Sequence, residues 1–106
     1  IYRELGAIRV QGKKQAINVY ELICKKEDYN ESLNQLLTKF EYARKLYLDQ
    51  KWNDAIKAFN KCALLEDMTN KFRKTNPSLA YINICNEYKV NPPEKSWNGV
   101  YSFKTK

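Results

Sequence analysis

The chain has 106 residues, a formal net charge of +7 and no histidine. The lack of histidine excludes a Ser-His or Cys-His nucleophile and a histidine metal ligand within this chain. No stretch approaches the ~20 apolar residues of a membrane-spanning helix. At this length one domain, or a domain with an appendage, can bury ~60–65% of the surface of its unfolded chain.

The cysteines and the charged residues indicate the environment of the protein. Cys24, Cys62 and Cys85 are an odd number, form no close pair and lie among apolar neighbours. We therefore expect reduced structural thiols and a cytoplasmic protein, whose parent can still be anchored in a membrane. The positive charge is compatible with contact to nucleic acid, anionic lipid or an acidic partner, but the basic residues are scattered among Asp and Glu, which favours a solvated surface. Because the first residue is Ile1, we expect a piece of a longer chain.

The first twenty residues show a strand pattern. Apolar and polar residues alternate on both sides of the polar stretch Gln11-Gly12-Lys13-Lys14, with Ile8 and Val10 before it and Ile17 and Val19 after it. This pattern predicts a β-hairpin over residues 1–23. A two-stranded hairpin is marginally stable in water, so we expect it to complete a larger sheet.

A helix is predicted after a polar linker at residues 24–30. Asp28 and Glu31 have capping-box spacing, and Asn30 is a competing cap. The helix should run from about residue 31 to 48, since its apolar residues recur at three and four positions. The stripe consists of Leu33, Leu36, Leu37, Phe40 and Ala43. We expect it to face the core of its own domain. Alternatively, the early turns of the helix form a lever between the hairpin and the helix pair, or the first four of these residues form a dimer seam.

Two further helices are predicted. The polar residues Asp49-Gln50-Lys51 interrupt the helical period, and a new apolar stripe follows, which indicates an antiparallel helix pair. Residues 66–76 are polar and basic and predict a loop with at most one helical turn. Asn76-Pro77-Ser78 then starts a third helix that packs on the second. It should end near Lys89, shortly before Pro92-Pro93.

The C-terminal segment combines a turn signal with a short apolar run, Trp97-Asn98-Gly99-Val100-Tyr101. A tryptophan this close to a terminus typically anchors a tail on a core. The expected fold is mainly α: a hairpin (1–23), a linker (24–30), and a domain (31–106) with a helical hairpin, a third helix and an extended tail.

The helix pair resembles a tetratricopeptide repeat. A close helix crossing needs small side chains at the contact and large ones beside it. The sequence offers Ala43, Ala55 and Cys62 as small residues and Tyr42, Trp52 and Phe59 as large ones, with Leu46 at the next packing position. The order and spacing are similar to those of the repeat. An ordinary helical hairpin is the alternative.

The hairpin resembles the last strands of the catalytic domain of class III nucleotidyl cyclases. The similar pieces are Arg3-Glu4-Leu5-Gly6, Ile8-Arg9-Val10, Gln11-Gly12-Lys13 and Val19-Tyr20-Glu21-Leu22. Gln11 departs from the lysine usual at that position. In some family members the lysine at the position of Lys13 reaches the nucleotide triphosphate, so the resemblance makes Lys13 a candidate contact in the parent. The alternative is a solvated turn residue.

The end of the chain resembles the ending of bacterial cyclases that carry a repeat-like region after the catalytic domain. The matching pieces are Pro77-Ser78, Cys85 and Tyr88, Pro92-Pro93, Trp97-Asn98-Gly99-Val100 and Lys106. The cyclase-like hairpin, the repeat and this ending follow one another in the order that the resemblance implies.

Together these resemblances imply a non-catalytic interaction and dimerisation region of a cyclase. The parent would convert a nucleoside triphosphate to a cyclic nucleotide, with Mg²⁺ or Mn²⁺ bound upstream, so we expect no catalytic residue, metal ligand or cofactor in this chain. Expected partners are the parent catalytic domain, a second copy and a further protein, but not nucleic acid. The alternative is a free-standing tetratricopeptide-like module that binds peptides.

Overall fold

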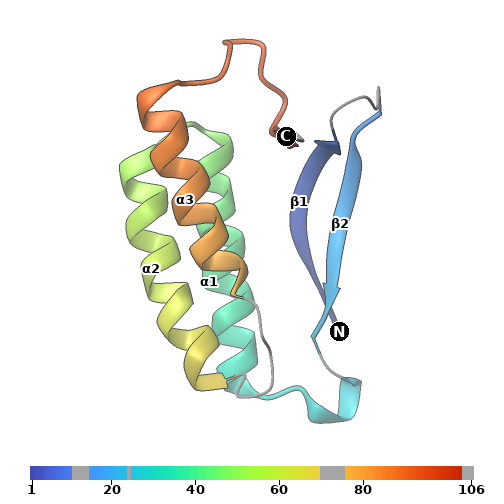
Figure 1. Cartoon of the computed structure of the whole chain (residues 1–106). Helices are drawn as coiled ribbons and strands as arrows, with labels where there is room; N and C mark the ends of the chain where they lie inside the picture. Colours follow the sequence, from blue (N-terminus) through green and yellow to red (C-terminus); the bar gives the residue numbers. More distant parts are fainter. Residues whose placement is uncertain (11–14, 24, 70–75, 104–106) are drawn as a thin grey trace. The chain divides into compact units, whose positions relative to one another are not determined.

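The computed structural model describes residues 1–10, 15–23, 25–69 and 76–103 (Figure 1). The chain forms two compact units. The first, here called the sheet unit, contains residues 1–29 and 94–106, and the second, the helical unit, contains residues 30–93. The C-terminal segment that the sequence analysis joined to the helices thus belongs to the same unit as the hairpin.

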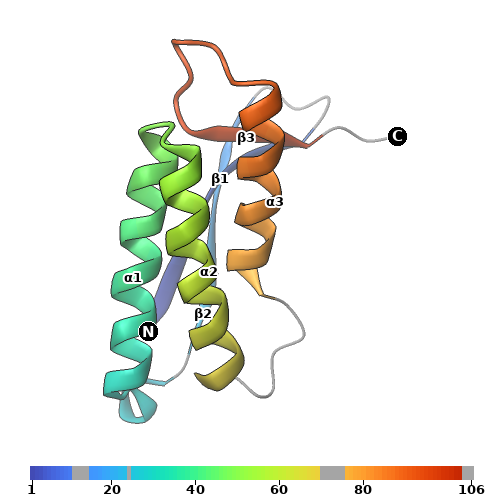
Figure 2. The same ribbon diagram turned by 90° about the vertical axis from the view of Figure 1, so that its left-hand side faces the viewer.

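The sheet unit has three strands in the order β2-β1-β3. Strands β1 (Tyr2–Val10) and β2 (Ile17–Leu22) pair antiparallel, which confirms the predicted hairpin. Strand β3 (Val100–Phe103) pairs in parallel with β1, from Ala7 opposite Val100 to Val10 opposite Phe103, and Figure 2 shows it beside β1. A mainly α fold is therefore correct only in part, because the tail ends in a third strand.

A β-bulge interrupts β1. The register shifts between Glu4, which pairs with Tyr20, and Gly6, which pairs with Val19, so that Leu5 is the extra residue. Gly6 has a φ of 144°, a region that side chains with a Cβ disfavour. The glycine after Leu5 is thus required by the backbone of the bulge.

The turn before β3 is closed by its own side chains. The Trp97 indole Nε1 donates a 2.8 Å hydrogen bond to the Val100 carbonyl, and the Val100 amide donates to Asn98 Oδ1 at 3.2 Å. Between them Gly99 has a φ of 89°, which favours glycine. The Trp-Asn-Gly-Val sequence therefore specifies the turn that starts the third strand.

The helical unit contains α1 (Glu31–Leu48), α2 (Trp52–Thr69) and α3 (Pro77–Val90). They run up, down and up, with α1 and α2 side by side and α3 packed on α2 (Figures 1 and 2). The predicted limits of the first helix and the predicted start of the third are confirmed. A short 3-10 helix (Lys26–Asp28) precedes α1 in the chain.

The N-cap of α1 is Asn30, whose Oδ1 accepts a 2.9 Å hydrogen bond from the Leu33 amide. The capping box proposed for Asp28 and Glu31 is wrong. Asp28 is the last residue of the 3-10 helix, and the backbone stays extended until Asn30, which places Asp28 too early to cap α1.

The prediction of a loop from residue 66 is wrong for its first four residues, because α2 continues to Thr69. Glu66 is buried, and its Oε2 accepts a 3.2 Å hydrogen bond from the Ser78 amide at the start of α3. Asn76 Nδ2 also donates to the Ala63 carbonyl at 3.3 Å. These hydrogen bonds to the start of α3 thus stabilise the C-terminal end of α2, although the sequence of this end is polar. Residues 70–75 of the predicted loop lie outside the described residues.

Aromatic rings form the core of the helical unit. The Tyr81 ring stacks on Phe59 with centroids 4.6 Å apart, and it meets Phe40 and Tyr47 edge-on at 5.8 and 4.8 Å. Tyr81 therefore joins α3 to both other helices. Leu36 and Phe40 are 0% and 1% exposed, so this part of the α1 stripe faces its own core and not a dimer partner. The other buried apolar residues are Ala43, Ala55, Cys62, Ala63 and Cys85.

Candidate functional site

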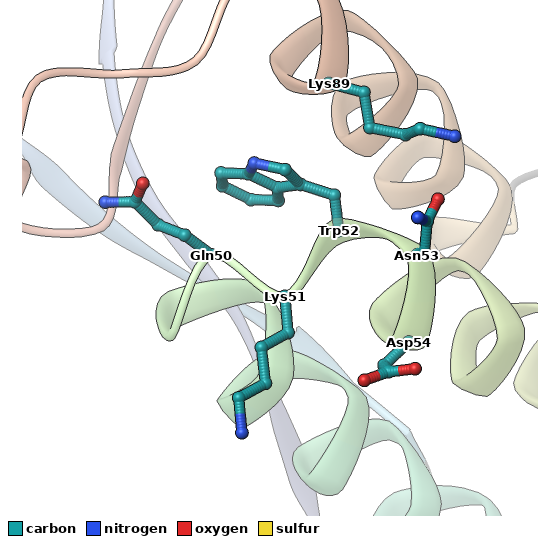
Figure 3. Close-up of a pocket in the computed structure, with 6 residues that line it drawn as sticks. All are labelled: Gln50, Lys51, Trp52, Asn53, Asp54 and Lys89. Atoms are coloured by element: carbon teal, nitrogen blue, oxygen red, sulfur yellow. The ribbon is translucent and has the colours of Figure 1, made fainter.

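Among the described residues of the helical unit, a first surface hollow lies at the turn between α1 and α2 (Figure 3). It has a volume of about 540 Å³ and is lined by Gln50, Lys51, Trp52, Asn53, Asp54 and Lys89. The Trp52 ring and the Lys89 side chain lie on one side of the turn, and the Lys51 side chain extends to the other (Figure 3). The two ammonium groups do not converge, so this hollow is not a preformed anion cage.

The backbone of this turn explains its shape. The Gln50 amide donates to the Tyr47 carbonyl at 3.0 Å, and the Lys51 amide donates to the Leu46 carbonyl at 2.9 Å. These two bonds form a Schellman motif, in which the residue after the cap takes the left-handed conformation. Gln50 occupies that position with a φ of 60°. Glycine is the usual residue there, since a Cβ costs ~1–2 kcal/mol in this conformation.

Trp52 is the main apolar group in the first hollow. Its ring centroid lies 5.6 Å from that of Tyr47 and 5.1 Å from that of Tyr88. It is half-buried, so one part packs on α1 and α3 and the rest lines the surface. Trp52 therefore ties the turn to α3 and stabilises the helical unit.

The second hollow is a groove between α1 and α2 with a volume of about 230 Å³. Its floor is apolar, with Tyr42 and Leu46 from α1 and Ala58 from α2. Tyr42 is 60% exposed, while Leu46 and Ala58 are half-buried. Four charged residues also line it: Lys39, Lys57, Lys61 and Asp54. An apolar floor with charged groups around it is the composition of a protein-interaction surface.

Two titratable groups of the helical core, the Cys85 thiol and the Tyr47 phenol, have raised pKa values. Burial raises the pKa of the Cys85 thiol to about 11, so the thiol is protonated at neutral pH. Burial, followed by the neighbouring Tyr88, Tyr81 and Cys85, also raises the pKa of the Tyr47 phenol. Within the described residues, no group of three or more cysteine, aspartate or glutamate side chains is arranged to hold a metal ion.

The structure separates the predicted packing residues by burial. Ala43, Ala55, Phe59 and Cys62 are buried, Leu46 and Trp52 are half-buried, and Tyr42 is mostly exposed. The small residues thus lie in the core of the helical unit, whereas Tyr42 lines the groove. Lys13, the candidate triphosphate contact, lies outside the described residues.

Sequence reasoning missed the lysines of the groove and the role of Glu66. In the sequence, Lys39, Lys57 and Lys61 look like an ordinary solvated helix face. A signal was nevertheless present, because Lys39 and Lys61 each come directly before a buried position, Phe40 and Cys62. This placement puts both lysines next to the core on the same face of the helix pair.

No protein family, curated protein or solved structure matches this chain. No helix among the described residues is both long and apolar enough to cross a membrane.

Proposed function

We propose that this chain is the non-catalytic C-terminal region of a class III nucleotidyl cyclase. In this proposal the closing hairpin of the catalytic domain is followed by a tetratricopeptide-like module for interaction and dimerisation. The parent makes a cyclic nucleotide from a nucleoside triphosphate, using a divalent metal and residues upstream of this chain. The chain itself contributes the end of the sheet and a helical support.

The pairing of β1 with β3 carries the proposal. The cyclase-like motif at Arg3–Gly6 and the cyclase-type ending at Trp97–Val100 stand near opposite ends of the sequence. Arg3–Gly6 lies within β1 and Val100 starts β3. These two strands pair over the residues that follow the motif, with Ala7 opposite Val100 and Ile8 opposite Tyr101. Two segments that resemble the same family in separate parts of the chain thus form one structural element. The helical unit is inserted between them, which supports its role as an appendage of the catalytic domain.

The arrangement of the helices supports the tetratricopeptide-like part. In such repeats the first helix of the next repeat packs on both helices of the preceding one. Here α3 contacts α2 through Tyr81 and Phe59, and Tyr81 also reaches Phe40 and Tyr47 on α1. The helices α1 and α2 then form one repeat, and α3 corresponds to the start of a second.

The exposed face of the hairpin supports attachment to a larger domain. Tyr2 and Leu22 are opposite each other in the register, and Tyr20 lies two residues along β2 on the same face. Their exposed fractions are 69%, 61% and 58%. Neighbouring apolar side chains this exposed mark a surface that packs against another part of a protein. The rest of a cyclase catalytic domain would supply that part.

The proposal is tested on the parent enzyme in three forms. One is intact, one lacks residues 30–106, and one has residues 30–93 replaced by a flexible linker so that β3 is kept. We expect the intact form to make a cyclic nucleotide in the presence of Mg²⁺ or Mn²⁺, and both altered forms to lose dimerisation and activity together. Sedimentation and cyclic-nucleotide formation are the measurements.

The three forms separate two roles of the helical unit. Loss of dimer and activity in the linker form makes the helical unit a brace for two catalytic domains. A linker form that stays dimeric and active makes it a docking or regulatory surface. An intact parent that forms no cyclic nucleotide from ATP or GTP would contradict the proposal as a whole.

A further inference from the structure

The groove between α1 and α2 lies on the side of the helix pair that faces away from α3. Lys39, Tyr42 and Leu46 each precede a core residue of α1, namely Phe40, Ala43 and Tyr47. Asp54, Ala58 and Lys61 each precede a core residue of α2, namely Ala55, Phe59 and Cys62. One residue turns an α-helix by about 100°. On two antiparallel helices the same offset brings the side chains to one common face.

The charge of the groove changes along its length. Because α1 and α2 are antiparallel around a turn at Gln50, Lys39 lies at about the height of Lys61, and Leu46 at about the height of Asp54. Tyr42 and Ala58 lie between these two ends. The groove is thus cationic at one end, apolar in the middle and weakly acidic near the turn, and Lys57 adds a third cation beside the apolar floor.

The cations of the groove are available to a partner. Lys39, Lys57 and Lys61 are exposed, and no described carboxylate forms an ion pair with them. By contrast, Lys45 on the outer face of α1 is paired with Glu41 at 3.9 Å. Three lysines against one aspartate leave the groove positive around an exposed tyrosine and a half-buried leucine.

We propose that this groove binds an acidic amphipathic helix of another protein. An apolar side chain of that helix sits between Tyr42, Leu46 and Ala58, and carboxylates one turn away pair with Lys39, Lys57 and Lys61. Docking of an amphipathic helix in a groove between two helices is a recurrent mode of peptide recognition. The charge of the groove selects an acidic helix, since opposite charges also steer the encounter.

The charged residues of the groove disfavour a second copy of this chain or a nucleic acid as its occupant. A second copy related by a two-fold axis would place the same lysine-rich face against itself, and like charges across an interface cost free energy. A nucleic acid would contact the lysines but make no use of the apolar floor, and Asp54 would repel its phosphates. An acidic helix uses both the floor and the cations.

The test is a binding measurement on the full 106-residue chain. The probe is a fluorescent peptide of about 18 residues, long enough to form a helix, with leucines on one face and glutamates beside them. A second peptide has the same composition in scrambled order, and a third has lysine in place of each glutamate. We expect the first peptide to raise the fluorescence anisotropy and to bind about tenfold more tightly than the scrambled one.

Matched variants locate the binding site. Lys57→Glu with Lys61→Glu should weaken binding of the acidic peptide by about tenfold or more. The control is Lys51→Glu with Lys89→Glu, which changes the net charge by the same amount on the same unit, outside the groove. It should change binding by less than about twofold, because distant charges are screened at physiological salt. Tyr42→Ser should weaken binding without changing the charge.

Several outcomes would overturn the proposal. Equal binding of the ordered and scrambled peptides, or equal losses in the two double-lysine variants, would reduce the effect to general charge attraction. A single-stranded RNA that binds with dependence on Lys57 and Lys61, where the acidic peptide does not, would make the groove a nucleic-acid site. A concentration-dependent dimer that Tyr42→Ser abolishes would assign the groove to a second copy.

The groove lies entirely on the helical unit. An acidic helix as its partner extends the proposed function, and peptide binding is measured independently of cyclase activity. A parent without cyclase activity whose chain binds the acidic peptide through the groove would remove the first proposal and leave the second. An active parent with no peptide binding would do the reverse.

Discussion

The two units of the chain differ in where their apolar side chains lie. All of the buried apolar side chains among the described residues belong to the helical unit, where Phe59 and Leu36 are 0% exposed. In the sheet unit the large apolar side chains Tyr2, Ile17, Tyr20 and Leu22 are 58–69% exposed. The helical unit therefore has a core of its own, whereas the sheet unit leaves these large apolar side chains exposed.

This difference follows from how each unit is assembled. The helical unit is one continuous segment in which helices that are neighbours in the sequence pack on each other. Contacts close in the sequence are therefore enough to bury its apolar side chains. The sheet unit joins two distant segments through β1 and β3, and none of the buried apolar side chains among the described residues lies on its three strands.

The largest expected effect distinguishes the two units directly. Phe59→Ala removes a ring that stacks on Tyr81 at 4.6 Å, and it should lower the free energy of unfolding by ~3–5 kcal/mol. Tyr20→Ala in the sheet unit should change it by less than ~0.5 kcal/mol, because the side chain is exposed. Urea unfolding followed by far-UV circular dichroism measures both. Comparable losses in the two variants would mean that the sheet face is buried within this chain.

Alkaline pH should weaken the helical core specifically. Burial raises the pKa of Cys85 from 9.0 to about 11, so folding keeps the thiol protonated where the unfolded chain would release its proton. Its contribution is fully present below pH 9 and is lost as the pH rises to 11, by about 2–3 kcal/mol. The Cys85→Ala variant should lack this loss. Urea unfolding of both proteins at several pH values measures it, and identical pH slopes would contradict the assignment.

Loss of the hydrogen bond between Glu66 of α2 and Ser78 of α3 should lower stability by an intermediate amount. Glu66→Ala removes the carboxylate that accepts from the Ser78 amide at 3.2 Å, at the N-terminus of α3. Asn76 Oδ1 also accepts from that amide at 3.1 Å, so the expected loss of stability is about 1–2 kcal/mol. Thermal unfolding measures it. Glu41→Ala is the matched control, since its carboxylate pairs only on the surface with Lys45 and should contribute less than ~0.5 kcal/mol.

How much of the fold could be predicted from the sequence depends on whether an element is held by contacts close in the sequence or by contacts with a distant segment. The limits of α1 and the start of α3 follow from apolar spacing and from caps such as Asn30 and Asn76, which act within a few residues. The last turns of α2 were predicted as loop because Glu66 is held by Ser78, a contact that local composition does not indicate. Strand β3 was missed for a similar reason, since it pairs with residues at the other end of the chain.

The candidate site was less predictable than the fold. Tyr42 was predicted as a packing residue, yet it lies mostly exposed in the groove, because the side chain points to the face without a third helix. The lysines around it are seen to line one groove only when α1 and α2 are placed side by side. A periodic pattern identifies the buried side of a helix, but it does not tell which exposed side chains from two helices meet.

The smallest expected effect concerns the turn that ends α1. Gln50 holds a left-handed conformation at a φ of 60°, so Gln50→Gly should raise the stability of the helical unit by ~0.5–1 kcal/mol. Gln35→Gly, at an exposed position inside α1, is the matched control and should lower stability by ~1 kcal/mol. Thermal unfolding of the two glycine variants measures both changes. Stability changes of opposite sign would show that the backbone of Gln50 is strained. Packing such as the contact of Trp52 with Tyr88 then holds the turn between α1 and α2 in spite of this strain. Losses in both variants would mean that Gln50 contributes a contact of its own that outweighs its backbone conformation.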